Sequence, residues 1–211
     1  MFARLLAYLQ LVLFQVLYLI RNHDEYLVTN SKAFKDHPQA TINLEAPECG
    51  ASGALLQDHH TCLDEDSNGK LPELRWNLPP TGEVAEFVLI IEDPDVPIPR
   101  MVFTHGLFFA IPATCLAAYH EDIEKNPTVP GRLTYAGWRF VPNLLGSSYV
   151  GAAAPYGHGY HRYVFTIVAL SEPLQFAKPD KVTVGIMKEA LVDKVLAWGQ
   201  WVGHFKRPLP R

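Results

Sequence analysis

The sequence contains no run rich in lysine or arginine, and its 211 residues carry a formal net charge of −4. A protein that follows a phosphate backbone gathers positive charge on one face or along one helix. We therefore expect no nucleic-acid partner. Low-complexity stretches and internal repeats are also missing. A composition of 48% hydrophobic and 19% charged residues is typical of a folded chain with a sizeable core.

Sequence motifs of several common enzyme classes are missing too. The chain has no phosphate-binding loop, no dinucleotide fingerprint, no Gly-x-Ser-x-Gly elbow and no His-Glu-x-x-His. Its three cysteines, Cys49, Cys62 and Cys115, lack the spacing of a zinc site, so we expect neither a metal nor a cofactor. The odd number favours reduced thiols and a cytoplasmic protein, whereas a Cys49–Cys62 bridge remains open if the protein is secreted.

The N-terminus is almost entirely apolar over residues 5–20, between Arg4 and Arg21. A bilayer span needs about 20 apolar residues, so this stretch is short for that role. A secretion signal would end in small residues, but Leu-Ile-Arg-Asn follows here. We expect residues 1–22 to form a helix that packs on a single domain, residues 23–211, or makes peripheral membrane contact through residues 1–21. A cleaved secretion signal is the alternative.

The rest of the chain predicts short strands, because 17 prolines and 14 glycines interrupt it often. Apolar runs or period-two alternation indicate strands at residues 41–44, 74–78, 87–91, 102–111 and 162–170. A second helix is expected over residues 181–199, where apolar side chains recur three and four residues apart. This order of elements favours a mainly β sandwich with a helix near each end.

Two polar segments lie beside predicted strands. The first, Asp93-Pro94-Asp95, follows a buried run and precedes His105, and the second spans residues 157–163. Taken singly, each has an ordinary explanation. Asp-Pro-Asp is a common turn, a lone histidine is more often structural than catalytic, and glycines around a histidine permit a tight loop.

Together, these segments identify a family. Asp93-Pro94-Asp95-x-Pro97, then His105, then Tyr149 and Gly157-x-Gly159-x-His161-Arg162-Tyr163, resemble the phosphatidylethanolamine-binding protein family, most closely its fungal branch. The resemblance runs from about residue 41 to residue 205. It implies a sandwich of two antiparallel sheets with a C-terminal helix, and a surface pocket that accepts phosphate-like or carboxylate-like anions.

The resemblance also implies which residues bind the ligand. They are Asp93, Asp95, His105, Gly151, Ala153, Pro155, His161 and Tyr163. Imidazole N–H groups, a tyrosine hydroxyl and loop amides are suitable donors to an anion.

The chain departs from the family pattern at two places. Gly106 follows His105 where the family usually has tryptophan, which predicts the loss of one aromatic wall. Gly151-Ala152-Ala153-Ala154-Pro155 replaces a loop in which arginine is common in the fungal branch. Without that guanidinium the pocket loses a bidentate anion clamp, so we expect it to be more apolar.

Two functions follow from the resemblance. The first is binding of an anionic small molecule or lipid head group in the pocket. The alternative is an accessory or catalytic part in a fungal natural-product pathway, such as dimerisation of maleic-anhydride polyketides to nonadrides, with a ketosteroid-isomerase-like partner. Whether the protein is an enzyme stays open. If it is, His105 and His161 are the candidate acid and base, because histidine titrates near neutral pH.

Overall fold

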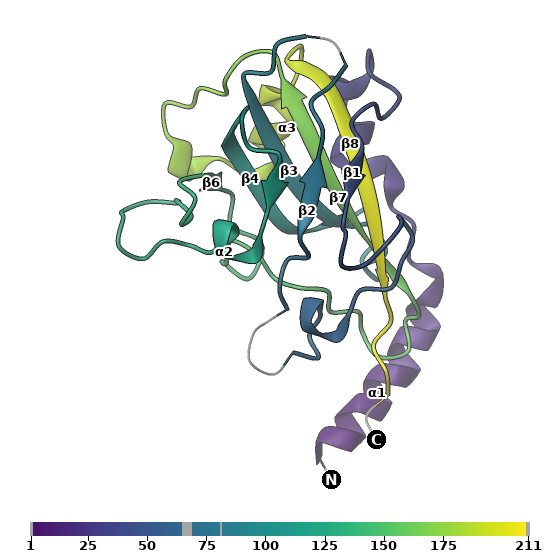
Figure 1. Ribbon diagram of the computed structural model, residues 1–211. Coiled ribbons are helices and arrows are strands. Elements are labelled where there is room, and N and C mark those ends of the chain that lie inside the picture. Colours follow the sequence, from purple (N-terminus) through teal and green to yellow (C-terminus); the bar gives the residue numbers. More distant parts are fainter. Residues whose placement is uncertain (1, 65–68, 81, 210–211) are drawn as a thin grey trace.

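Two antiparallel sheets form the protein in the computed structural model, which describes residues 2–64, 69–80 and 82–209, with side chains from residue 8 onward (Figure 1). The large sheet has the strand order β6-β4-β3-β7-β8, and the small sheet has the order β1-β2-β5. The predicted mainly β sandwich is thereby confirmed. The strands are β1 (Leu44–Glu45), β2 (Leu74–Trp76), β3 (Glu86–Asp93), β4 (Phe103–Pro112), β5 (Ala117–Ala118), β6 (Arg139–Phe140), β7 (His161–Leu170) and β8 (Val195–Phe205).

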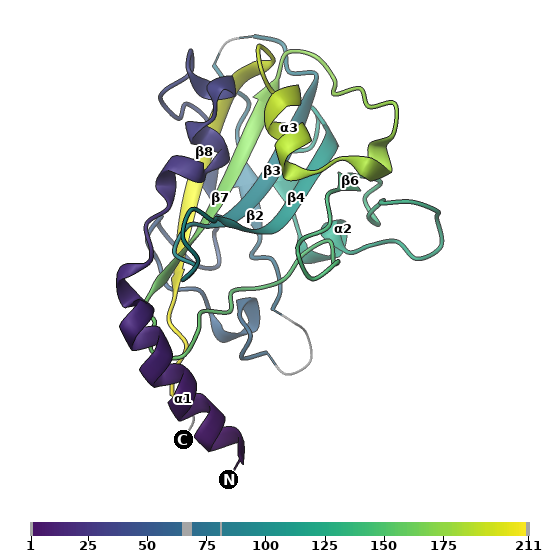
Figure 2. The ribbon, with the colours of Figure 1, turned by 180° about the vertical axis from the view of Figure 1, so that it is seen from behind.

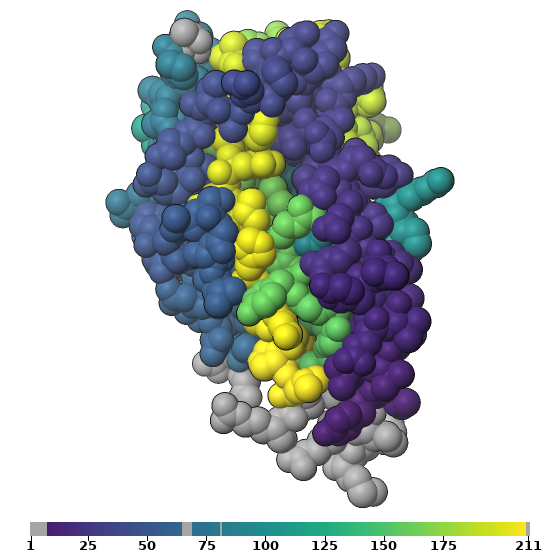
Figure 3. All heavy atoms as spheres, turned by 90° about the vertical axis from the view of Figure 1, so that its right-hand side faces the viewer, coloured from purple at the N-terminus to yellow at the C-terminus, as the bar shows by residue number. Residues whose placement is uncertain are grey.

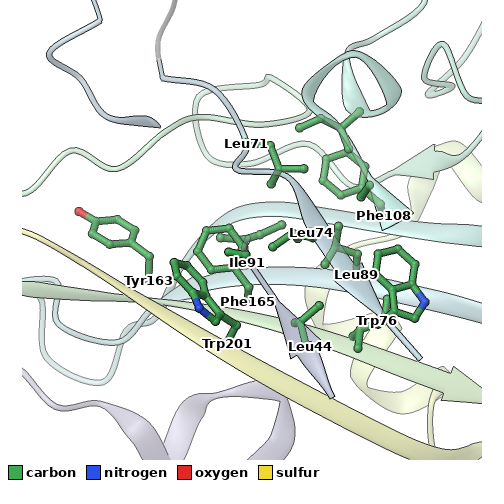
Figure 4. Packing of buried hydrophobic residues seen from close by; sticks show 14 of the residues in the cluster. Leu44, Leu71, Leu74, Trp76, Leu89, Ile91, Phe108, Tyr163, Phe165 and Trp201 are labelled. Carbon is green, nitrogen blue, oxygen red and sulfur yellow. The ribbon is translucent and has the colours of Figure 1, made fainter. Parts of the chain in front are cut away.

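Strand β3 lies at the centre of the large sheet and is buried along its whole length. Leu89 and Ile91 face the small sheet and pack in one core cluster with Leu74 (Figure 4). Val88 and Ile90 belong to a second cluster on the opposite face, where helix α3 (Val184–Ala190) covers the sheet (Figure 2). A strand covered on both faces needs apolar residues at every position, which explains the continuous apolar run.

The expected helix over residues 181–199 is wrong in its second half. Helix α3 ends at Ala190, and Asp193 has a φ of +61°, a left-handed conformation that turns the chain. From Val195 onward the chain is β8, in which buried and partly exposed residues alternate without exception. The spacing of apolar residues three and four apart therefore concealed a period of two, and the element after α3 is a strand.

Glycine is required within β8 at a point of close approach. A Cβ on Gly199 would lie 2.2 Å from the carbonyl oxygen of Ile42. The amides of Thr41 and Ile42 both donate to the carbonyl oxygen of Trp198 beside it. Any larger residue at position 199 would push this N-terminal segment off the strand.

The N-terminal segment consists of one helix followed by several 3-10 turns. Helix α1 (Phe2–Val16) continues into η1 (Leu17–Leu19), and the chain then passes β8 along one side of the molecule (Figure 3). Among the described residues, no helix has the length and apolarity needed to cross a bilayer. The remaining short helices are η2 (Asp24–Tyr26), η3 (Val28–Asn30), η4 (Lys32–Phe34), η5 (Asp58–His60), α2 (His120–Ile123) and η6 (Pro179–Lys181).

A buried carboxylate holds η3 against the large sheet. Glu92 of β3 is 1% exposed, and its two oxygens accept from the amide of Val28 at 3.1 and 3.2 Å. Burial raises the pKa of Glu92 to about 7, although this amide and the charge of Lys188 oppose the shift. The folded protein therefore binds this proton more tightly than the unfolded chain does. The resulting stability is present in full below about pH 4.5 and is lost as pH rises to about 7.

We expect Glu92→Gln to remove this pH dependence. Relative to the wild type, the variant should gain about 3 kcal/mol of unfolding free energy between pH 4 and pH 8. Urea unfolding at a series of pH values measures the difference. A difference between the two proteins that does not change with pH would contradict the assignment.

Candidate functional site

A pocket of about 240 Å³ opens between the end of β3, the start of β4 and the loop over residues 145–155. Its walls are mostly apolar, and their polar side chains are Asp93, His105 and His161. The other lining residues are Val96, Pro97, Phe103, Leu145, Val150, Gly151, Ala153 and Pro155. The expectation of an apolar pocket agrees with this lining.

A β-bulge aims His105 into the pocket. In the pairing of β3 with β4, Ile91 lies opposite Gly106 and Glu92 lies opposite Thr104, so His105 is an extra residue without a partner on β3. Bulges commonly redirect a side chain beside a functional site. The carbonyl oxygen of His105 accepts instead from the amide of Val150, in the loop that forms the opposite wall.

Gly106 does not face the pocket. A Cβ at this position would lie 2.8 Å from the ring of Phe108 and 3.1 Å from that of Tyr149, both in the core between the sheets. The predicted loss of an aromatic wall therefore does not concern the pocket, whose aromatic wall is Phe103. The ring of Phe103 lies 4.7 Å from that of His105.

The imidazole of His105 favours its neutral form. Burial lowers its pKa, and Asp93 opposes this only in part. Its Nδ1 lies 2.8 Å from the carbonyl oxygen of Val150, which can only accept, so Nδ1 carries the proton. Nε2 is then an acceptor. The histidine can take a proton from a ligand, and it donates to an anion only after it has become protonated.

A chain of three hydrogen bonds runs from Asp93 to the N-terminal helix. Asp93 Oδ2 lies 2.8 Å from His161 Nδ1, and His161 Nε2 lies 2.8 Å from His158 Nδ1. His158 Nε2 lies 3.1 Å from the carbonyl oxygen of Leu17. The four residues lie on β3, β7, the loop before β7 and η1.

This series of three hydrogen bonds requires one proton more than two neutral imidazoles provide. The carbonyl of Leu17 and an ionised Asp93 can only accept, and each of the three bonds needs one proton. Two neutral rings supply two. The third makes one ring an imidazolium beside the Asp93 carboxylate, or else protonates Asp93 itself. Burial lowers the pKa of His158. Both ring nitrogens of His161 are engaged in this series, by Asp93 and by His158.

The loop around His158 is shaped to receive α1. Gly157 has a φ of +84°, and a Cβ there would lie 2.6 Å from the side chain of Leu11 and 2.9 Å from its carbonyl oxygen. The rings of Phe14 and Tyr18 also contact that of His158. Helix α1 therefore packs on the domain along this side. Its outer side chains, including Leu9, Val12, Leu13 and Val16, are exposed.

Asp95 lies behind the pocket and does not line it. Its side chain is fully buried and accepts from Arg162 at 2.8 and 2.9 Å, and from the amide of Asn22 at 3.2 Å. Burial alone would raise the pKa of Asp95, but the hydrogen bonds and charge of Arg162, with Arg21, hold it at about 2. This carboxylate joins the start of the domain to β7.

Tyr163 also lies behind the pocket, at the edge of the core (Figure 4). Its hydroxyl oxygen accepts from the amide of Ala153 at 3.1 Å, and its ring lies 5.0 Å from that of His105. Of the predicted ligand residues, the structure thus gathers Asp93, His105, Gly151, Ala153, Pro155 and His161 on the pocket. The sequence analysis did not predict a role for His158. The only indication in the sequence was that His158 lies three residues before His161.

Comparison with known proteins identifies the family. The model of the family described as phosphatidylethanolamine-binding protein matches residues 47–206, which is more than half of the chain. This chain belongs to the phosphatidylethanolamine-binding protein family. The crystal structure of E. coli YbcL, described as a new member of the mammalian family, shares the fold with a TM-score of 0.65. It is 20% identical and covers 80% of this chain and 100% of its own.

Two fungal relatives match almost the whole of this family member. A protein named phomoidride biosynthesis cluster protein B, from a fungal species, is 34% identical over 209 residues, covering 96% of both chains. A protein of the same name from Talaromyces stipitatus is 32% identical over 207 residues, covering 96% of this chain and 83% of its own.

In this family member, Asp95→Asn should destabilise the fold by about 3 kcal/mol at pH 7, because it breaks a buried pair and leaves Arg162 with Asp24 and the side-chain oxygen of Asn22. The folded pKa of Asp95 is depressed, so its contribution is present above about pH 3.8 and is lost as pH falls toward 2. Urea unfolding measures the loss. The matched control Asp24→Asn removes a carboxylate whose side chain is 44% exposed and should cost less than about 1 kcal/mol. Equal losses for the two variants would refute the assignment.

His158→Leu should loosen α1 while the sheets stay intact. The variant removes the donor to Leu17 and leaves His161 Nε2 without its partner. Hydrogen exchange of residues 8–19 should accelerate about tenfold, as expected for two lost hydrogen bonds. Tyr160→Ala, which alters an exposed side chain in the same loop, is the control. Unchanged hydrogen exchange in His158→Leu would show that the hydrogen bonds through His158 do not hold the helix.

Proposed function

We propose that this protein is a component of a fungal natural-product pathway and holds a largely apolar metabolite in its pocket. The observation that carries the proposal is the match of 96% of this chain to two proteins named for phomoidride biosynthesis clusters. With 96% of this chain aligned, only a few of its residues lie outside the match. The match therefore extends into the N-terminal segment, which the family model over residues 47–206 does not cover.

The chemistry of the pocket supports an apolar ligand over a permanent anion. An anion needs donors, but Nδ1 of His105 is used by Val150, and both ring nitrogens of His161 are used by Asp93 and His158. The guanidinium of Arg162 is engaged by Asp95 and Asp24 behind the pocket. Asp93, the third polar side chain of the wall, is hydrogen-bonded to His161. Binding of a phosphate or a lipid head group is thus the less favoured function.

The size of the pocket limits what can enter. Pockets for drug-sized ligands usually enclose about 300–1,000 Å³, and this one encloses about 240 Å³. It suits one ring or the end of an alkyl chain. A maleic-anhydride ring bearing alkyl substituents, as in the pathway alternative, satisfies both the size and the apolar lining.

If the pocket also catalyses a step, His105 is the base. Its Nε2 lone pair can take a proton from an alkyl carbon attached to the ring double bond, a position that conjugation with the carbonyl makes acidic. The C–H bond breaks, an N–H bond forms, and the electron pair stays on the ligand, delocalised into the carbonyl. The imidazolium formed lies near Asp93, whose charge favours it. A carbanion of this kind begins a carbon–carbon dimerisation, for which a ketosteroid-isomerase-like protein is the proposed partner.

Binding and proton transfer can be measured separately on the full chain. We expect a 2,3-dialkylmaleic anhydride to bind at least about tenfold more tightly than phosphate or phosphoethanolamine in calorimetric titrations. The hydrogens on the alkyl carbons attached to its ring double bond should exchange with deuterated water, followed by NMR. His105→Phe replaces the imidazole with an apolar ring of similar shape and should preserve binding, but it should slow the exchange by about 100-fold or more. His37→Phe is the control.

Each measurement can fail by itself. Tighter binding of phosphate than of the anhydride would refute the apolar ligand. Exchange that is equally fast in His105→Phe and the wild type would refute the base while leaving the binding function intact.

A further inference from the structure

A cluster of two histidines and one glutamate lies outside the pocket. Glu48 follows β1, and His59 and His60 end the short helix η5. His60 Nε2 lies 3.5 Å from Glu48 Oε1, and His59 Nε2 lies 3.7 Å from Glu48 Oε2. One donor atom from each of the three residues lies within 4.8 Å of the others. Ligands of a tetrahedral zinc ion lie about 3.4 Å apart, so these atoms need only a small movement to share one ion.

One donor of the cluster is buried and has no hydrogen-bond partner. His60 is 1% exposed, and its Nε2 makes no hydrogen bond in the part of the chain that the structure describes. A buried polar atom without a partner costs free energy, so its presence calls for an explanation. The contact to Glu48 at 3.5 Å lacks hydrogen-bond geometry. Among the described residues, no group therefore donates a hydrogen bond to the lone pair of His60 Nε2.

The neighbours of the cluster orient it as a metal site requires. His60 Nδ1 lies 3.1 Å from the carbonyl oxygen of Lys70, which fixes the proton on Nδ1 and leaves Nε2 as a ligand. Glu48 Oε1 accepts from the amide of Glu73 at 2.6 Å. Neutral imidazole is the form that binds a metal.

We propose that Glu48, His59 and His60 bind one divalent transition-metal ion of the zinc class. Two imidazoles and a carboxylate suit zinc, cobalt or nickel and are a poor set for calcium or magnesium, which prefer all-oxygen ligands. Glu48 and His59 are partly exposed, so water can take the remaining position. This departs from the expectation of no metal, which rested on cysteine spacing and overlooked a glutamate 11 residues before His59.

The site joins two segments that support the pocket wall. The carbonyl oxygen of His60 accepts from the amide of Ala152, and Ala153 lines the pocket. A metal would tie the turn after β1 to η5 and thereby stiffen the loop over residues 151–155. The proposal is independent of the pathway function, since none of its three ligands lines the pocket.

The test uses the full chain without a histidine tag, stripped with a chelator and titrated with zinc and with cobalt. We expect one equivalent of either metal, and a cobalt spectrum of a four-coordinate site without a thiolate charge-transfer band. Zinc at a hundredfold excess over its Kd should raise the midpoint of thermal unfolding by about 5–10 °C.

Variants locate the ion. His59→Ala, at an exposed position, and Glu48→Gln should each weaken zinc binding by more than about 100-fold and abolish the thermal shift, because each removes a ligand. His37→Ala, which lies outside the cluster, should behave as the wild type. The proposal is overturned if zinc does not bind, if binding survives both ligand variants, or if a thiolate band shows that a cysteine such as Cys49 holds the cobalt.

Discussion

Strand β3 is covered by the small sheet on one face and by α3 and the 3-10 turns on the other, and the rest of the fold is arranged around it. Burial on both faces forces its residues to be apolar until the strand reaches the edge of the core. There the sequence changes abruptly to Glu92, Asp93, Pro94 and Asp95. Three carboxylates at the end of a fully buried strand must each find partners, because an unpaired buried charge is costly. The surroundings of the pocket follow from how each is satisfied.

The three carboxylates are satisfied by different parts of the chain. Glu92 accepts an amide from η3, Asp95 pairs with Arg162, and Asp93 faces His161. The Glu92 contact attaches η3 to the sheet, and Asp95 also accepts from the amide of Asn22. The third contact continues through His158 to α1. Charge around the pocket is therefore largely neutralised within the protein. Few donors remain for a ligand, which is why a family pattern associated with anions here surrounds an apolar cavity.

Sequence patterns predicted the main strands because burial on both faces makes β3 and most of β7 continuous apolar runs. They failed over residues 190–199, where Val195 and Trp198 fit a helical spacing as well as a strand, and the pairing of β8 with the distant strand β7 makes the segment a strand. The positions of Asp93, His105 and His161 followed from family resemblance. The bulge that aims His105 did not, since it depends on the register of two strands. Asp95 and Tyr163 fit the motif but turn away from the pocket, because Arg162 and Ala153 hold them. The proposed site at Glu48, His59 and His60 is assembled from the turn after β1 and from η5, and no local sequence pattern predicts it.

The contact between residues 41–42 and Trp198 constrains the order in which the protein folds. The N-terminal segment is synthesised well before β8, the strand on which it rests. The loop around His158, which α1 contacts through Phe14, is likewise made long after the helix. Contacts so distant in sequence close slowly. The helix and the segment that follows it can therefore dock only late in folding, after most of the large sheet has been made.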